Sequence, residues 1–205
     1  MEYSKWLYAL SEECRREFKG RRMESHDLNH SMRVWKNAEK LGKEFNADME
    51  VLVAAVFLHD VGVAHTNDLK HGKESARIAR KALERIGFPE GKISSALEAI
   101  EQHDDVKKQR KSLESKILFD CDNMDAFGAV GVFRYLDIYA KRGWGIREIA
   151  EHVCENVKER FRNLHFRQSR KICRENYEFT RKYFLKLKKE LGSNYFRKKE
   201  EKREN

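Results

Sequence analysis

Apolar side chains recur every three or four residues along most of the chain, which is the spacing of one face of an α-helix. Stretches with this spacing cover residues 28–45, 78–86, 93–100, 146–164 and 172–187. Pro89 is the only proline, so the strongest helix breaker is almost absent. Lys, Glu, Arg, Leu and Ala, which favour helices, are frequent. The sequence therefore predicts an all-α protein.

The run at residues 51–58 is apolar at every position, which fits either a buried strand or a helix that is buried on all sides. Asp48 is a good helix N-cap just before the run, and the run contains two alanines. No other segment offers a strand for it to pair with. We therefore expect a buried helix that Gly62 ends. At eight residues the run is far too short to span a bilayer, so no membrane-spanning segment is expected.

The formal net charge of +9 lies entirely after residue 154, because the residues before that point carry equal numbers of basic and acidic side chains. Bulk charge therefore carries no information about a site in the first three quarters of the chain. Residues 166–191 are expected to form a basic helix that packs on the rest, and residues 192–205 a charged tail without fixed structure. The basic helix is either a solvated face or a docking surface for nucleic acid or another polyanion.

The cysteines are scattered along the chain at positions 14, 121, 154 and 173, with no C-x-x-C spacing. This pattern argues against a zinc ribbon and against a disulfide scaffold. It is typical of a reducing compartment, and the first residues do not resemble a secretion signal. We therefore expect a cytoplasmic protein.

Histidines are concentrated in the first half of the chain. Those between positions 26 and 103 are His26, His30, His59, His65, His71 and His103. His26, His30 and Arg33 are spaced to share one helical stripe. His59 and Asp60 directly follow the apolar run, and since an isolated buried carboxylate is very costly, the pair forms either a buried ion pair or part of a metal site.

Further polar side chains occur where apolar neighbours point inward. By helical spacing, His71 and His103 lie on inward faces, and Asp122 and Asp125 share a face with Leu118. Converging imidazoles and carboxylates suit Mn, Mg, Co, Ni, Fe or Zn without selecting one of them. The alternatives are a structural network of ion pairs for the carboxylates and ordinary core packing for His71 and His103. His65, His152 and His165 are expected to be surface or packing residues.

The segments His26-Asp27-Leu28-Asn29-His30 and Leu58-His59-Asp60-Val61-Gly62, followed by Asp122, resemble the H…HD…D pattern of the HD-domain metal-dependent phosphohydrolases. The similarity extends from about residue 20 to about residue 140. It is greatest to the bacterial and archaeal subgroup that includes nucleotide pyrophosphohydrolases. The resemblance implies a compact helical bundle, with an HD-type domain over residues 1–165 and a basic C-terminal helical extension at 166–191.

The resemblance also implies roles for individual residues. One divalent metal ion would be bound by His30, His59, Asp60 and Asp122. The catalytic residues would be Asp60, Arg33, Lys116 and Asp125. Arg33 and Lys116, with His71 and His103, would contact the substrate. His26 and Asp27 would orient the metal ligands. A water activated by the metal would attack the phosphorus of a phosphoester or phosphoanhydride, and the subgroup resemblance favours a nucleotide as the substrate.

Several alternatives stay open beside this reading. A second metal ion is disfavoured because Asp104 follows His103, where HD families with two metals usually have paired histidines. The same feature argues against a di-iron oxygenase of this fold. Cys121 is either a weak extra ligand or a core residue, and Arg134 either pairs with a carboxylate structurally or acts in the site. In a different class of function, the basic C-terminal region would bind nucleic acid and the HD site would be auxiliary.

Overall fold

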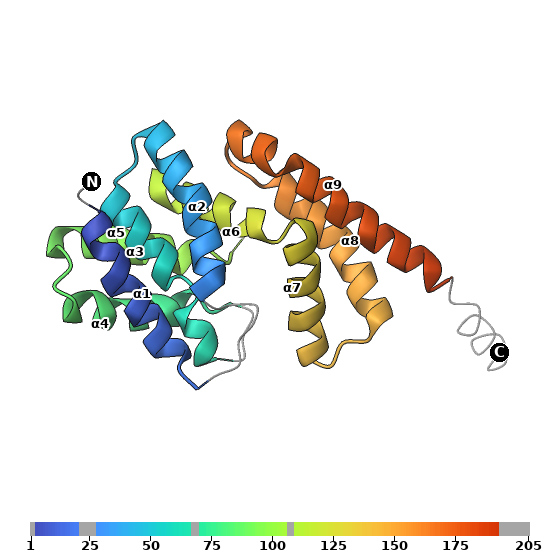
Figure 1. Cartoon of the computed structure of the whole chain (residues 1–205), viewed down its shortest axis with the longest axis horizontal. Helices are drawn as coiled ribbons and strands as arrows, with labels where there is room; N and C mark the ends of the chain where they lie inside the picture. The colour runs from blue at the N-terminus through green and yellow to red at the C-terminus, as the bar shows by residue number, and fades with distance from the viewer. Residues whose placement is uncertain (1–2, 21–27, 67–69, 106–108, 193–205) are drawn as a thin grey trace.

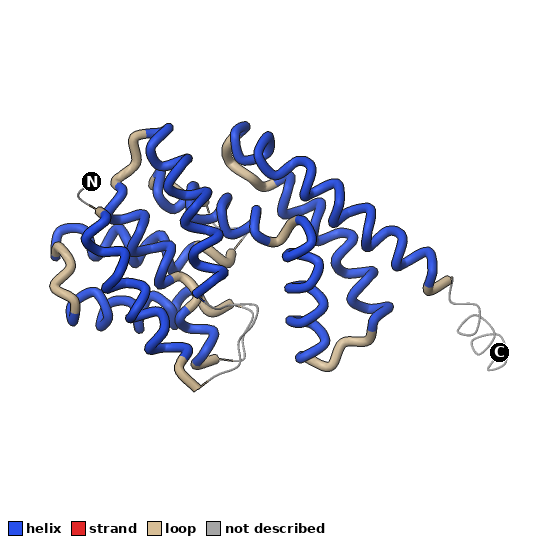
Figure 2. The backbone as a smooth tube through the Cα atoms, in the orientation of Figure 1, coloured by secondary structure: helices blue, strands red, loops and turns tan. Residues whose placement is uncertain are grey.

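Helices make up the fold in the computed structural model, which describes residues 3–20, 28–66, 70–105 and 109–192 (Figures 1 and 2). They are α1 (Ser4–Phe18), α2 (Leu28–Phe45), α3 (Met49–Leu58), the 3-10 turn η1 (Val61–Ala64), α4 (Gly72–Arg85), α5 (Glu90–Gln102), α6 (Leu113–Asp125), α7 (Gly128–Lys141), α8 (Ile146–Arg162) and α9 (Arg167–Glu190). Within these ranges there is no strand. The predicted all-α class is therefore confirmed.

The apolar run forms α3, and the prediction of a helix buried on all sides is confirmed. Asp48 caps the helix by accepting hydrogen bonds from the backbone N–H groups of Glu50 and Val51, at 3.0 and 3.2 Å. Every residue from position 50 to 58 is buried, because α1, α2 and α5 pack around the helix. We expected Gly62 to end this helix, and that was wrong. The helix ends four residues earlier, at Leu58, and Gly62 lies in η1.

The helices form two groups, each with its own hydrophobic core. One core is built from α1 to α6, and the other from the end of α6 together with α7, α8 and α9. In Figure 1 the two groups lie side by side, and α6 leads from the first to the second. Asp122 and Asp125 lie at the end of α6, so they occupy the junction between the two cores.

The basic C-terminal helix α9 packs against α8 and α7, with a smaller contact to α6. Its buried residues include Thr180, whose hydroxyl accepts a hydrogen bond from the Gly128 N–H at 2.7 Å and so fixes the start of α7 to α9. The packing thus groups α7 and α8 with α9. The domain limits at residues 165 and 191 stay predictions, and the predicted tail lies outside the described residues apart from Gly192.

Two smaller expectations concern the membrane and the cysteines. In the part of the chain that the structure describes, no helix combines the length and the apolar character needed to cross a membrane. All four cysteines are buried and none forms a disulfide.

Two glycines allow unusually close contacts on either side of His71. A Cβ atom on Gly62 would lie 2.5 Å from the Ser75 backbone nitrogen and 2.8 Å from the His71 carbonyl oxygen. A Cβ atom on Gly72 would lie 2.7 Å from the Glu101 carbonyl oxygen. These distances are below normal contact, so only glycine lets η1, α4 and the end of α5 approach so closely. The backbone of His71 is held between them.

We expect Gly72→Ala to lower the free energy of unfolding by about 1–3 kcal/mol, because the added methyl group must displace the backbone at the end of α5. Gly91→Ala is the matched control. Gly91 lies in α5 with open space around its missing side chain, so alanine there should be neutral or stabilise by about 0.5–1 kcal/mol. Denaturant unfolding followed by circular dichroism measures both. Equal stability of the two variants would contradict the close-contact interpretation.

Candidate metal centre

Three separate parts of the fold bring together His30, His59, Asp60 and Asp122, hereafter the primary cluster. His30 comes from α2, His59 and Asp60 follow α3, and Asp122 comes from α6. The Nε2 atom of His30 lies 3.1 Å from Nε2 of His59, 3.2 Å from Oδ2 of Asp60 and 3.3 Å from Oδ1 of Asp122. His30 and His59 are fully buried. The structure thus places in one cluster the four residues that the family resemblance implies as ligands.

Hydrogen bonds on the far side of each imidazole set its orientation. Nδ1 of His30 lies 2.8 Å from Oδ2 of Asp125, and Nδ1 of His59 lies 2.7 Å from the carbonyl oxygen of Val56. Because both acceptors lack a proton, each Nδ1 donates, and each Nε2 faces the cluster. Two Nε2 atoms only 3.1 Å apart require a proton or a cation between or beside them. This is the arrangement in which imidazoles bind a metal ion.

The charges of the primary cluster favour a cation. Burial opposes protonation of His30, but the adjacent carboxylates of Asp122, Asp125 and Asp60 raise its pKa to about 10. Burial likewise opposes ionisation of Asp60, yet the neighbouring imidazoles hold its pKa well below the ordinary value. Oδ2 of Asp60 is buried and makes no hydrogen bond to any described residue. A buried carboxylate oxygen is seldom left without a hydrogen bond, so a divalent cation fits the donor set.

A second group of ligand atoms lies on the other side of Asp60. Its members are His71, His103 and Asp104, hereafter the second cluster, whose ligand atoms lie within 4.8 Å of one another. Nε2 of His71 lies 2.8 Å from Oδ1 of Asp60 and 3.1 Å from Nε2 of His103. His103 donates from Nδ1 to the carbonyl oxygen of Ile100, at 2.7 Å. Nε2 of His103 therefore faces Nε2 of His71 and, at 3.3 Å, Oδ1 of Asp60, where it suits a cation.

Asp125 lies behind His30 and is surrounded by donors. Besides His30, its carboxylate accepts hydrogen bonds from Arg33 at 2.8 and 3.0 Å and from Arg134 at 2.8 Å. These ion pairs hold its pKa below the ordinary value against the opposing effect of burial. The predicted catalytic role of Asp125 stays a prediction, but its contacts favour a role in orienting His30. Arg134 pairs with a carboxylate, one of the two alternatives considered for it.

The other residues singled out in the sequence have varied positions. Lys116 is half-buried on α6 and is not among the described residues that line the cavity, so its phosphate-binding role stays a prediction. His26 and Asp27 lie outside the described residues. Cys121 is fully buried, and burial, with the nearby charges of Asp120 and Asp122, raises its pKa well above the ordinary value. The thiol is therefore protonated and behaves as a core residue.

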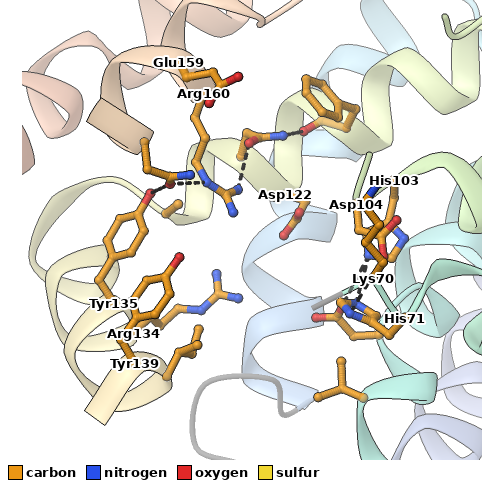
Figure 3. Close-up of a pocket in the computed structure, with 18 of the residues that line it drawn as sticks. Lys70, His71, His103, Asp104, Asp122, Arg134, Tyr135, Tyr139, Glu159 and Arg160 are labelled. Carbon is orange, nitrogen blue, oxygen red and sulfur yellow. Dashed lines mark hydrogen bonds and ion pairs between the residues drawn. The ribbon is translucent and has the colours of Figure 1, made fainter. Parts of the chain in front are cut away.

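A cavity of about 330 Å³ opens beside both clusters, between the two groups of helices (Figure 3). Asp60, Asp122 and the second cluster form one wall, and α7 and α8 form the other. The lining residues that sequence reasoning did not single out include Lys70, Asn123, Tyr135, Tyr139, Asn156 and Arg160. His152, expected to be a surface or packing residue, also lines the cavity and lies 2.9 Å from the hydroxyl group of Tyr139. Asn156 and Arg160 follow Val153 and Val157 by three residues each, and this helical spacing is the signal that could have identified them.

Comparisons with known proteins agree with this geometry. The model of the HD domain matches residues 27–126. An uncharacterized protein of Bacillus subtilis (strain 168), YpgQ, is 23% identical over 186 residues, which cover 81% of this chain and 84% of YpgQ. The solved structure of B. subtilis YpgQ in complex with ADP has a TM-score of 0.75 at 22% identity and covers 94% of this chain and 98% of that one.

Another similar structure is that of a predicted HD superfamily hydrolase from an uncultured Thermotogales bacterium. It has a TM-score of 0.64 at 24% identity and covers 91% of this chain and 94% of that one. At such identities the structural likeness establishes the fold. Together with the domain match, it supports the assignment of this chain to the HD-domain superfamily of metal-dependent phosphohydrolases. The clustered histidines and aspartates accordingly support a metal-dependent hydrolase.

We expect Asp125→Asn to weaken binding of a divalent metal ion by about 10- to 100-fold, because His30 loses its charged hydrogen-bond partner. Asp137→Asn is the control, since Asp137 pairs with Lys141 on α7 and has no contact with the clusters. Titration of both proteins with Mn²⁺ or Zn²⁺, followed by calorimetry, measures the difference. Unchanged affinity in Asp125→Asn would show that His30 is oriented without it.

Proposed function

We propose that the protein is a phosphohydrolase that uses one divalent metal ion, bound at the primary cluster, to cleave a phosphoester or phosphoanhydride bond of a nucleotide. The observation that carries the proposal is the buried Oδ2 of Asp60, which lies 3.2 Å from Nε2 of both His30 and His59 and makes no hydrogen bond to any residue that the structure describes. When bound there, a divalent ion would lower the pKa of a coordinated water and polarise a phosphoryl group.

The side chains around the primary cluster would prepare the substrate for this chemistry. Asp125 and the Val56 carbonyl fix the two imidazoles, so little reorganisation is needed when the ligands bind. His71 and His103 lie on the cavity side of Asp60, where they would donate to phosphoryl oxygens and balance developing negative charge. Arg33 is held by Asp125, and we propose that it, with Lys116, contributes positive charge at longer range.

Three observations favour a nucleotide as the substrate. The cavity beside the clusters is of the size that small-molecule sites have, and its lining combines cationic side chains with tyrosines. Tyr135 and Tyr139 stack nearly parallel, with ring planes 5° apart, and present an aromatic wall that suits a base or a sugar. The YpgQ protein of B. subtilis, which has the same fold, was solved in complex with ADP.

Asp60→Ala and Asp122→Ala should each abolish bound metal and turnover together, because each removes a carboxylate ligand whose charge the remaining imidazoles cannot replace. Glu98→Ala, which alters an exposed residue of α5, is the control and should retain both. Metal analysis of the purified proteins and assays of phosphate and pyrophosphate release measure the outcome. Full activity in either aspartate variant would overturn the assignment.

Removal of metal provides an independent test. Treatment with a chelator should abolish hydrolysis, and addition of one of Mn²⁺, Mg²⁺, Co²⁺, Ni²⁺, Fe²⁺ or Zn²⁺ should restore it. A screen of nucleoside mono-, di- and triphosphates with each ion identifies the bond that is cleaved. The number of ions per chain follows from the same metal analysis, and one per chain is expected. Hydrolysis that survives the chelator would contradict a metal-dependent reaction.

A further inference from the structure

Arg160 lies on α8, outside the residues matched by the HD domain, yet its side chain reaches the same cavity as Asp122. Figure 3 shows its guanidinium group pointing into the cavity, across from His71 and His103. The C-terminal group of helices therefore contributes a cation to the site. The family motif does not include this residue.

Two neutral amide groups hold the guanidinium group in place. Nε of Arg160 donates to Oδ1 of Asn156 at 2.9 Å, and Nη1 donates to Oδ1 of Asn123 at 2.8 Å. Asn123 is fixed in turn by donating from Nδ2 to the carbonyl oxygen of Phe119 at 2.7 Å, and Asn156 also accepts from the hydroxyl of Tyr135 at 2.8 Å. Two hydrogen bonds to neutral acceptors therefore orient the guanidinium group without neutralising its charge.

The charge balance of Arg160 differs from that of the other arginines near the primary cluster. Arg33 and Arg134 both form ion pairs with Asp125. For Arg160, no carboxylate of a described residue lies within 4.0 Å of its nitrogens. Arg142 also lines the cavity but is exposed, so water solvates its charge. A half-buried guanidinium group that is oriented only by neutral groups can bind an anion without first breaking an ion pair.

We propose that Arg160 binds a second phosphate of the substrate, linked to the phosphate that lies at the primary cluster. This inference rests on the proposed function and makes Arg160 a specificity-determining residue for substrates with two or more linked phosphates. The planar guanidinium fork suits phosphate oxygens, and three of its five N–H groups are not used by the two amides. A single phosphate bound between Asp122 and the second cluster would not need this group.

Binding of inorganic pyrophosphate and of inorganic phosphate, measured by calorimetry on the metal-loaded full chain, tests the proposal. Arg160→Ala should weaken pyrophosphate binding by about 10-fold or more, the loss of a charged hydrogen bond, and should change phosphate binding less than 3-fold. Arg160→Lys should recover part of the loss. Arg162→Ala removes an exposed arginine of the same helix that does not line the cavity, and it should bind pyrophosphate as the unaltered protein does.

Asn156→Asp tests whether the unneutralised charge of Arg160, and not only its orientation, is needed to bind the second phosphate. This change preserves the acceptor for Arg160 and Tyr135 but supplies a carboxylate that would neutralise the guanidinium group. It should therefore weaken pyrophosphate binding as Arg160→Ala does, while thermal stability and metal content stay unchanged. Unchanged pyrophosphate binding in Arg160→Ala, an equal loss of phosphate binding, or no pyrophosphate binding by the unaltered protein would each overturn the proposal.

The kinetic counterpart is a comparison of a nucleoside diphosphate with bis(p-nitrophenyl) phosphate, which has one phosphate. Arg160→Ala should raise KM about 10-fold or more for the diphosphate only. If the protein hydrolyses nucleotides but binds pyrophosphate equally well without Arg160, this inference is refuted and the proposed function is not. Pyrophosphate binding that depends on Arg160, without hydrolysis of any phosphate compound, refutes the proposed function alone.

Discussion

The carboxylate of Asp60 is the group on which the arrangement of the site depends. Oδ2 lies 3.2 Å from Nε2 of His30 and of His59, and Oδ1 lies 2.8 Å from Nε2 of His71. A buried carboxylate is stable only if positive charge surrounds it, and here that charge must come from protons on the imidazoles or from a cation among them. The Asp60 carboxylate therefore has to be the meeting point of four elements, namely α2, the end of α3, α4 and α5. The close packing of the first core follows from this electrostatic requirement as well as from apolar burial.

Backbone contacts make that meeting possible. α3 is buried on all sides, so it can end deep in the core and deliver His59 and Asp60 there. Its last turn also provides the Val56 carbonyl that orients His59. Gly62 and Gly72 then let η1, α4 and α5 approach more closely than any side chain would permit, which brings His71 against Asp60. The contact between His71 and Asp60 thus depends on the backbone geometry at these two glycines.

Much of the fold and part of the site could be predicted from the sequence. Helical spacing predicted the all-α class, and Asp48 with the apolar run predicted α3, because capping and burial are local properties. The family resemblance supplied the members of the primary cluster. The end of α3 at Leu58 was missed because glycine was taken as a terminator, whereas Gly62 serves a contact with residues of α4. Such a contact is long-range and leaves no trace in the spacing of neighbouring residues.

The grouping of α7 and α8 with α9 is the feature that local patterns could least predict, since periodicity indicates which face of a helix is buried but not against which helix. It matters because the two cores meet at the end of α6, and a cavity remains between them. The wall formed by the first core holds the groups that we propose bind the metal ion and the reacting phosphate. The wall formed by the second core has Tyr135, Tyr139 and Arg160, which belong to helices beyond the HD domain match. Substrate choice can therefore change through α7 and α8 while the primary cluster stays the same.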